Sequence, residues 1–174
     1  MNLKKIGIIL FAAALSLSAT GCVEREIVQE NKVENIPDVT IKTDIEINWD
    51  QVMDDCEALL DPEEYPYGCY LDFAVHDDTN TTEIIWPLKS DCPVKEMPKY
   101  GEAFAKAFND AISIQDFSVA QSSDDSYGGY WENHDMDVQV YYEKDIMEPK
   151  KYWVNQIIPA GSNDPIILNP NLEE

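Results

Sequence analysis

Basic residues are scarce in this sequence: its 174 residues include 12 Lys and Arg against 34 Asp and Glu, which gives a formal net charge of −22 at pH 7. A chain with this balance presents no basic patch, and phosphate backbones and anionic lipid headgroups repel it. The composition therefore excludes a nucleic-acid-binding protein. The partners that the charge favours are cations, cationic peptides and basic protein surfaces.

Histidine and cysteine are also scarce, with two and four copies. No C-x-x-C or H-x₃₋₅-H spacing is present, which disfavours zinc, and the G-x-S-x-G, H-E-x-x-H and S-x-x-K signatures are absent. One catalytic alternative pairs Cys69 or Cys92, as nucleophile, with His134 as base. Because Cys92 stands in a proline-bounded segment and each histidine stands beside acids, we favour structural cysteines and surface histidines. We expect a non-enzymatic protein with no catalytic residue, metal or cofactor.

Glycine is limited to 7 residues, whereas hydrophobic residues make up 44% of the chain. The chain can therefore bury a core despite its charge. Helical spacing predicts helices over residues 49–60 and 100–112. Alternating apolar residues predict strands at residues 39–47, 69–76, 82–88, 117–121, 136–142 and 152–158. This order predicts a single α+β domain, in which an antiparallel sheet of about four to six strands has two helices packed on it.

The N-terminal segment carries the most specific pattern. Lys4 and Lys5 precede an almost unbroken apolar stretch over residues 6–17, and the small residues 18–21 lead directly to Cys22. The stretch is shorter than the roughly 20 apolar residues of a membrane-spanning helix. This order is typical of a secretory signal peptide. The cysteine directly after the cleavage site resembles the lipobox of bacterial prolipoproteins.

The resemblance implies a signal peptide over residues 1–21, cleavage after Gly21 and lipidation of Cys22. It also implies that acyl chains on Cys22 hold the protein to the cell membrane, on its extracytoplasmic face. Cleavage removes 2 of the 12 basic residues and no acidic residue, which leaves 10 basic against 34 acidic residues and a net charge of −24. Residues 22–37 are polar and predict a flexible tether, followed by the acidic domain over residues 38–174.

The strands over residues 69–76 and 82–88 form the clearest predicted hairpin. Turn-forming residues 77–80 separate them. We expect Phe73 to pair with Leu88, since that register keeps the apolar side chains on one face. Pro87 cannot donate to a sheet ladder, so its strand is predicted at an edge.

Three cysteines remain for the domain, which in an oxidising compartment predicts one disulfide and one thiol. Cys69 and Cys92 lie at similar distances from the predicted turn, so we favour a Cys69–Cys92 bond. A Cys56–Cys69 bond is the alternative.

Residues 124–134 combine acids with Tyr, Trp, Ser, Gly and Asn, which is the composition of contact loops. The candidate binding residues are Tyr127, Tyr130, Trp131, Asn133 and His134. The alternative is a hairpin connection whose aromatic side chains enter the core.

Two acid-rich turns offer oxygen ligands of the kind that calcium takes. One contains Asp77, Asp78, Asn80 and Glu83, and the other contains Asp124, Asp125, Ser126, Asn133 and Asp135. Neither follows the EF-hand spacing, and Asp and Asn are ordinary turn residues. We interpret both as solvated turns.

These patterns predict a lipid-anchored extracytoplasmic surface protein that acts as a binding module through aromatic- and acid-rich loops. The expected partner is a protein or a cell-wall ligand. Two alternatives remain, a cell-envelope enzyme that uses the Cys/His groups and an accessory subunit of an envelope complex.

The anchor can be tested first. Cys22→Ala is expected to abolish lipidation, so that the domain is released or the precursor stays uncut, because an acidic domain has no other attraction to the bilayer. Membrane fractionation with mass spectrometry of the amino terminus measures this. A mature Cys22→Ala protein that stays firmly in the membrane fraction would contradict the lipoprotein hypothesis.

Overall fold

The structure is a computed structural model that describes residues 45–172. These residues belong to one compact unit. The predicted signal peptide, Cys22, the tether and most of the strand predicted over residues 39–47 lie outside the described residues. Within the described range, no helix has the length and apolar character needed to cross a membrane.

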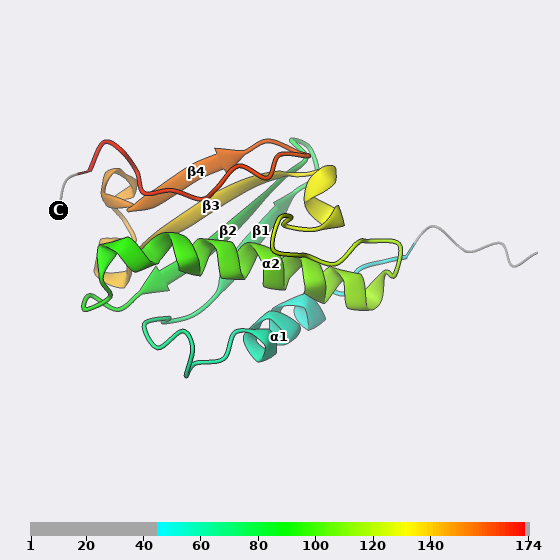
Figure 1. The fold of residues 1–174 in the computed structure, drawn as a ribbon, viewed down its shortest axis with the longest axis horizontal. Coiled ribbons are helices and arrows are strands. Elements are labelled where there is room, and N and C mark those ends of the chain that lie inside the picture. Colours follow the sequence, from blue (N-terminus) through cyan, green and yellow to red (C-terminus); the bar gives the residue numbers. More distant parts are fainter. Residues whose placement is uncertain (1–44, 173–174) are drawn as a thin grey trace, which may run out of the picture. The chain divides into compact units, whose positions relative to one another are not determined.

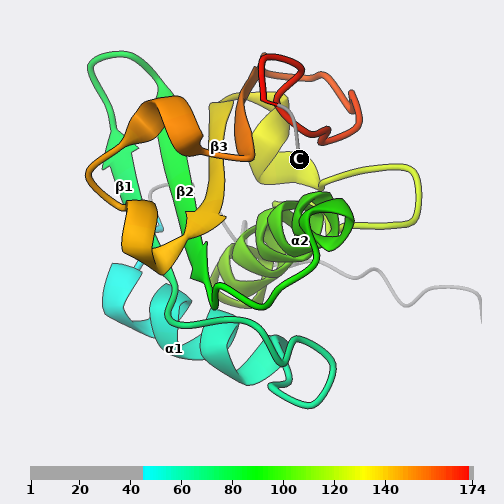
Figure 2. The same cartoon turned by 90° about the vertical axis from the view of Figure 1, so that its left-hand side faces the viewer.

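The described residues form two α-helices and one four-stranded sheet, so the predicted α+β class is confirmed (Figure 1). The elements are α1 (Trp49–Leu59), β1 (Asp72–His76), β2 (Thr81–Leu88), α2 (Met97–Gln115), β3 (Asp135–Tyr142) and β4 (Val154–Ile158). The strand order is β1-β2-β3-β4. Figure 2 shows α2 on one face of the sheet, with α1 beside it. The two long connections, residues 60–71 and 116–134, carry most of the surface features discussed below.

The sheet is mixed, which corrects the predicted antiparallel sheet. β1 and β2 are antiparallel, as are β3 and β4, but β2 and β3 are parallel. A parallel pair cannot be joined by a tight turn and needs a long crossover. The chain provides it with α2, which lies between β2 and β3 in the sequence.

The two helices are confirmed, and each has a local reason to form. The Asn48 side chain accepts a hydrogen bond from the backbone N–H of Gln51, which caps α1. The buried side chains of Val52 and Cys56 lie on one face of α1, and α1 packs against α2. In α2, a Cβ at Gly101 would come within 3.0 Å of a methyl group of Val138, so this glycine lets the helix approach the sheet closely.

The predicted hairpin forms around residues 77–80, but its register differs from the prediction. Phe73 lies opposite Ile84 and not opposite Leu88. The two registers differ by four residues, an even number, so both keep the same side chains on the core face. Alternation of apolar residues therefore cannot distinguish them.

The edge position predicted for β2 is wrong, because β2 pairs with β1 on one side and β3 on the other. The Pro87 carbonyl accepts a hydrogen bond from the N–H of Cys69, so the backbone groups of Pro87 face the segment before β1. Regular pairing with β1 has already ended at this level. The missing N–H of Pro87 therefore costs the parallel ladder with β3 no hydrogen bond.

The strand predicted over residues 117–121 does not form. Phe117 is 90% exposed, and both the N–H and the hydroxyl of Ser118 donate to the Asp116 carboxylate in a local turn. Residues 45–47, the described end of the first predicted strand, are also irregular. The strands predicted over 136–142 and 152–158 are confirmed as β3 and β4.

The core lies between α2 and the inner face of the sheet, and Phe108 is at its centre. Phe108 is completely buried, and its ring lies 4.9 Å from that of Phe73 and 5.5 Å from that of Trp131. These contacts join α2 to the hairpin and to the connection before β3. Phe117, by contrast, is almost fully exposed.

Phe108 and Phe117 form a matched pair for a stability test. Phe108→Ala is expected to lower the free energy of unfolding by about 3–5 kcal/mol, because it leaves a cavity among aromatic rings. Phe117→Ala is expected to change it by less than about 0.5 kcal/mol. Urea denaturation followed by circular dichroism measures both, and equal losses would contradict the described core.

Candidate functional site

The aromatic residues of the predicted contact loop are buried in the structure. Tyr127, Tyr130 and Trp131 are 6%, 7% and 3% exposed. They therefore do not form an exposed aromatic surface, and the core alternative describes them correctly. The physical reason is that the connection over residues 116–134 crosses the edge of the core, where burial of a large aromatic ring is favourable.

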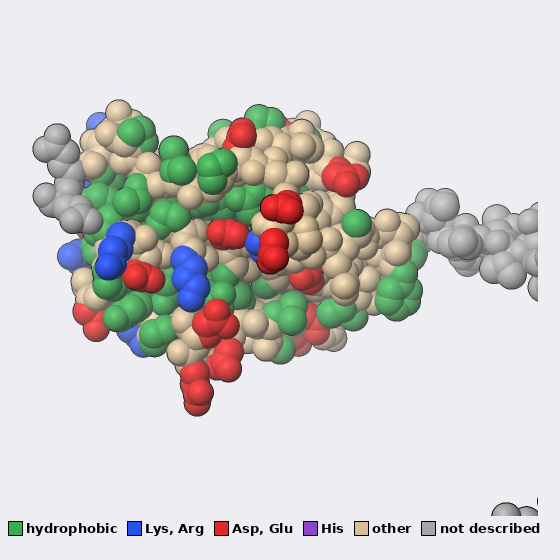
Figure 3. All heavy atoms as spheres, in the orientation of Figure 1, with side chains coloured by type: hydrophobic (Ala, Val, Ile, Leu, Met, Phe, Trp, Pro, Cys, Tyr) green, Lys and Arg blue, Asp and Glu red, His purple; other side chains and the backbone are tan. Residues whose placement is uncertain are grey.

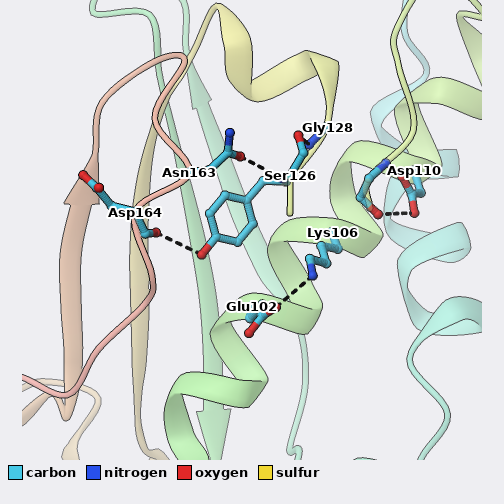
Figure 4. Close-up of polar contacts among 9 residues, drawn as sticks. Glu102, Lys106, Asp110, Ser126, Gly128, Asn163 and Asp164 are labelled. Carbon is cyan, nitrogen blue, oxygen red and sulfur yellow. Dashed lines mark hydrogen bonds and ion pairs between the residues drawn. The ribbon is translucent and has the colours of Figure 1, made fainter. Parts of the chain in front are cut away.

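Each of the three rings also makes a polar contact that fixes the connection. The indole N–H of Trp131 donates to the carbonyl of Ala105 in α2 at 2.9 Å. The hydroxyls of Tyr130 and Thr82 lie 2.7 Å apart, and the hydroxyl of Tyr127 donates to the carbonyl of Asp164 at 3.1 Å (Figure 4). The connection is thereby joined to α2, β2 and the C-terminal segment.

Asn109 provides the central polar contact of this region. It is completely buried on α2, its amide N–H donates to the carbonyl of Ala120, and its amide oxygen accepts from the N–H of Tyr130. Gly128 packs directly on it with φ +104°, and a Cβ there would lie 2.0 Å from the amide nitrogen. Only glycine fits at this position.

Asn133 and His134 lie beside the hairpin turn. The Asn80 side chain donates to the carbonyl of Asn133. The His134 ring stacks on Tyr130 with centroids 4.0 Å apart, and its Nδ1 lies 2.9 Å from the Tyr130 carbonyl. Asn80 of the first acid-rich turn thus contacts Asn133 and Asp135 of the second, since its carbonyl also accepts the N–H of Asp135.

The tip of the connection projects two acids over α2. Asp124 and Asp125 form a polar hollow of about 250 Å³ together with Glu102 and Lys106 of α2 and Asn163 of the C-terminal segment. Figure 3 shows acidic side chains around one basic group over the middle of α2. We call these five residues the acidic hollow.

The acidic hollow is held in place by contacts on three sides (Figure 4). The Asp110 carboxylate accepts both the N–H and the hydroxyl of Ser122 at 2.7 Å. The Asn163 side chain accepts the N–H of Tyr127 at 3.1 Å. Lys106 pairs with Glu102 at 2.8 Å, which leaves Asp124 and Asp125 in excess of the positive charge.

Sequence reasoning missed three residues of the acidic hollow. Glu102 and Lys106 carry one signal, a spacing of four residues on a predicted helix, which is typical of an ion pair. Nothing in the sequence connects Asn163 with them, because the contact depends on how the C-terminal segment returns along α2.

The cysteines of the described residues are free thiols, so the predicted disulfides do not form. The hairpin register explains this, because Cys69 donates its N–H to Pro87 and lies opposite that residue, while Cys92 lies five residues further along the chain. Burial raises the pKa of Cys56 to about 12 and the pKa of Cys92 to about 11. Burial and then Glu143 raise the pKa of Cys69.

The thiols therefore lack the environment of a nucleophile. A reactive cysteine needs a lowered pKa, which a neighbouring cation or an adjacent base provides. Cys69 has the opposite neighbour, since its thiol lies 3.8 Å from the Glu143 carboxylate and donates to it. Among residues 45–172, no three His, Cys, Asp or Glu side chains are arranged to hold a metal ion.

The outer face of the sheet carries a second acidic feature, the carboxyl pair Glu83 and Asp137. They lie opposite each other on β2 and β3. Asp137 Oδ1 is buried without a hydrogen-bond partner, whereas Gln139 donates to Glu83. Burial and then Glu83 raise the pKa of Asp137. The nearby His76 lies 3.9 Å from Glu83.

Comparison with known proteins returns no match, whether with protein-family models, with curated proteins or with solved structures.

Asp137 provides a pH test of the outer face. A raised native pKa means that the folded chain binds this proton more tightly than the unfolded chain, so its contribution to stability falls as pH rises through the native pKa. Asp137→Asn is therefore expected to raise the urea midpoint at neutral pH, with a gain that shrinks on acidification. The exposed turn variant Asp78→Asn is the control, and equal behaviour of the two variants would refute the argument.

Proposed function

We propose that this chain is a lipid-anchored protein of the extracytoplasmic membrane face that binds a cationic protein or cell-wall ligand through the acidic hollow. The anchor follows from the lipobox resemblance at Cys22. The ligand class follows from the charge, since a chain of net −24 after cleavage attracts cationic groups and repels anionic ones.

One observation carries the proposal: Asp124 and Asp125 are exposed acids that lie just before Tyr127, Tyr130 and Trp131, whose rings are buried. The rings and Asn109 fix the backbone, so the two carboxylates are presented without a large loss of loop entropy on binding. Lys106 is already paired with Glu102 and does not neutralise them. A ligand with two or more separated positive charges fits this arrangement.

Binding is better supported than catalysis. The described thiols have raised pKa values, and the ring of His134 is stacked on Tyr130. Neither group is arranged as the nucleophile and base that the enzyme alternative needs.

A matched pair of double variants tests the hollow. A tetra-lysine peptide is titrated into the full chain at low ionic strength. Asp124→Asn with Asp125→Asn is expected to weaken its binding roughly three- to tenfold, the effect of losing two solvent-exposed charge contacts. Asp77→Asn with Asp78→Asn removes the same net charge from another turn and is expected to change binding much less. Equal weakening by both doubles would mean that only net charge matters and would overturn the proposed site.

A further inference from the structure

A second hollow lies apart from the acidic hollow, between the end of α1 and the connection that leads to β1. Its volume is about 290 Å³, and it is mainly apolar. We call it the Trp86 groove and define it by Leu60, Pro62, Tyr65, Gly68, Cys69 and Trp86. In Figure 1 the connection lies below the N-terminal half of α2, beside α1. Its size is close to the lower limit of ligand pockets, about 300 Å³, and suits one or two side chains.

Aromatic contacts make the wall of the Trp86 groove rigid. The ring of Trp86 lies 4.9 Å from that of Tyr100, edge to face, and 5.5 Å from that of Tyr65. Tyr65 and Tyr100 also contact each other at 5.4 Å. The apolar surface is therefore formed before any ligand arrives, which lowers the entropy cost of binding.

The wall also contains a hydrogen-bond donor that lacks an acceptor. Trp86 is 4% exposed, and within residues 45–172 its indole N–H donates to no acceptor; the nitrogen is not among the fully buried unpartnered atoms, so it remains accessible. The nitrogen lies against Gly68, where a Cβ would come within 2.7 Å of it. The N–H of a largely buried indole ring usually has a hydrogen-bond partner. A ligand carbonyl in the Trp86 groove would supply one.

The rim of the Trp86 groove is acidic. Glu57 lines it, and the exposed turn after α1 adds Asp61, Glu63 and Glu64. Figure 3 shows acidic side chains projecting from the molecule below α2. Lys99 pairs with Glu64 at 3.6 Å and lies over the Tyr65 ring, and Lys89 donates to the Pro66 carbonyl, so the four acids outnumber the two nearby cations. An apolar wall with this rim is complementary to an apolar side chain between positive charges.

We propose that the Trp86 groove binds a protein segment in which a large apolar residue is flanked by lysine or arginine. The apolar side chain packs against Trp86 and Tyr65, a backbone carbonyl of the segment accepts the indole N–H, and the flanking cations pair with Glu57 and the acids of residues 61–64. A second copy of this chain fits less well, since two strongly acidic surfaces repel each other. This site does not depend on the acidic hollow.

Three six-residue peptides on the full chain test this proposal. The probe is Lys-Arg-Leu-Phe-Arg-Lys, one comparison peptide replaces Leu-Phe with Gly-Ser, and the other replaces every cation with an acid. The probe is expected to bind at least about tenfold more tightly than the Gly-Ser peptide, because a buried Leu or Phe side chain contributes well over a factor of ten. The acidic peptide is expected not to bind. Equal affinity for the probe and the Gly-Ser peptide would overturn the proposal.

Variants then assign the binding to the groove. Trp86→Phe keeps an aromatic ring and removes the indole N–H, so it is expected to weaken binding of the probe about three- to tenfold. Glu57 is exposed on α1, so Glu57→Gln leaves the core unchanged. It is expected to weaken binding of the probe and to reduce the salt dependence of that binding. Asp124→Asn with Asp125→Asn is the control and is expected to leave the ratio between probe and Gly-Ser peptide unchanged. These variants distinguish failure of the proposed site in the acidic hollow from failure of the proposed site in the Trp86 groove.

Cys69 offers a direct readout of occupancy. It lines the groove and is partly exposed, whereas Cys56 and Cys92 are buried. The probe is expected to slow the modification of Cys69 by N-ethylmaleimide, located by mass spectrometry. An unchanged rate with bound probe, or an unchanged probe affinity in both Trp86→Phe and Glu57→Gln, would refute the groove. Self-association that Glu57→Gln enhances would identify a second copy as its occupant and would also refute the proposal.

Discussion

The packing of Phe108 is the interaction on which the rest of the structure depends. Its ring contacts Trp49 of α1, Phe73 of β1, and Tyr130 and Trp131 of the connection before β3. The segments that meet there are far apart in the sequence. The parallel pairing of β2 and β3 also depends on this contact, since the crossover through α2 is stable only when α2 packs on the sheet.

The neighbouring Asn109 connects this packing to the backbone of the connection over residues 116–134. Because it is buried, its amide must find partners, and it finds them in Ala120 and Tyr130. Gly128 is required by the close approach of the same amide. Tyr127, Tyr130 and Trp131 therefore hold this connection against the core, and the acids Asp124 and Asp125 at its tip face the solvent.

The sequence allowed much of the fold to be predicted, because the decisive patterns are local. The helical spacing of residues 49–60 and 100–112 and the turn at residues 77–80 depend on neighbours a few positions away. The register at Phe73 and the interior position of Pro87 have no such local signal. The alternation of apolar residues is the same for registers that differ by an even number of residues. The parallel pairing of β2 and β3 is set by the packing of α2 and has no local signature.

The candidate site was less predictable, for a related reason. Composition identified residues 124–134 as unusual, but it could not decide whether the rings face solvent or the core. Glu102 and Asn163 reach the acidic hollow only through tertiary contacts.

The two hollows share one structural element, α2, and this has a consequence for recognition. Tyr100 supports the wall of the Trp86 groove from the first half of the helix, and Glu102 and Lys106, two and six residues further on, contribute to the acidic hollow. A helix whose apolar face is fully packed cannot rotate or shift without loss of core contacts. The acids of the connection and the acids around the groove are therefore held at a constant separation. A partner with two basic segments at that separation would gain from both sites with little further ordering.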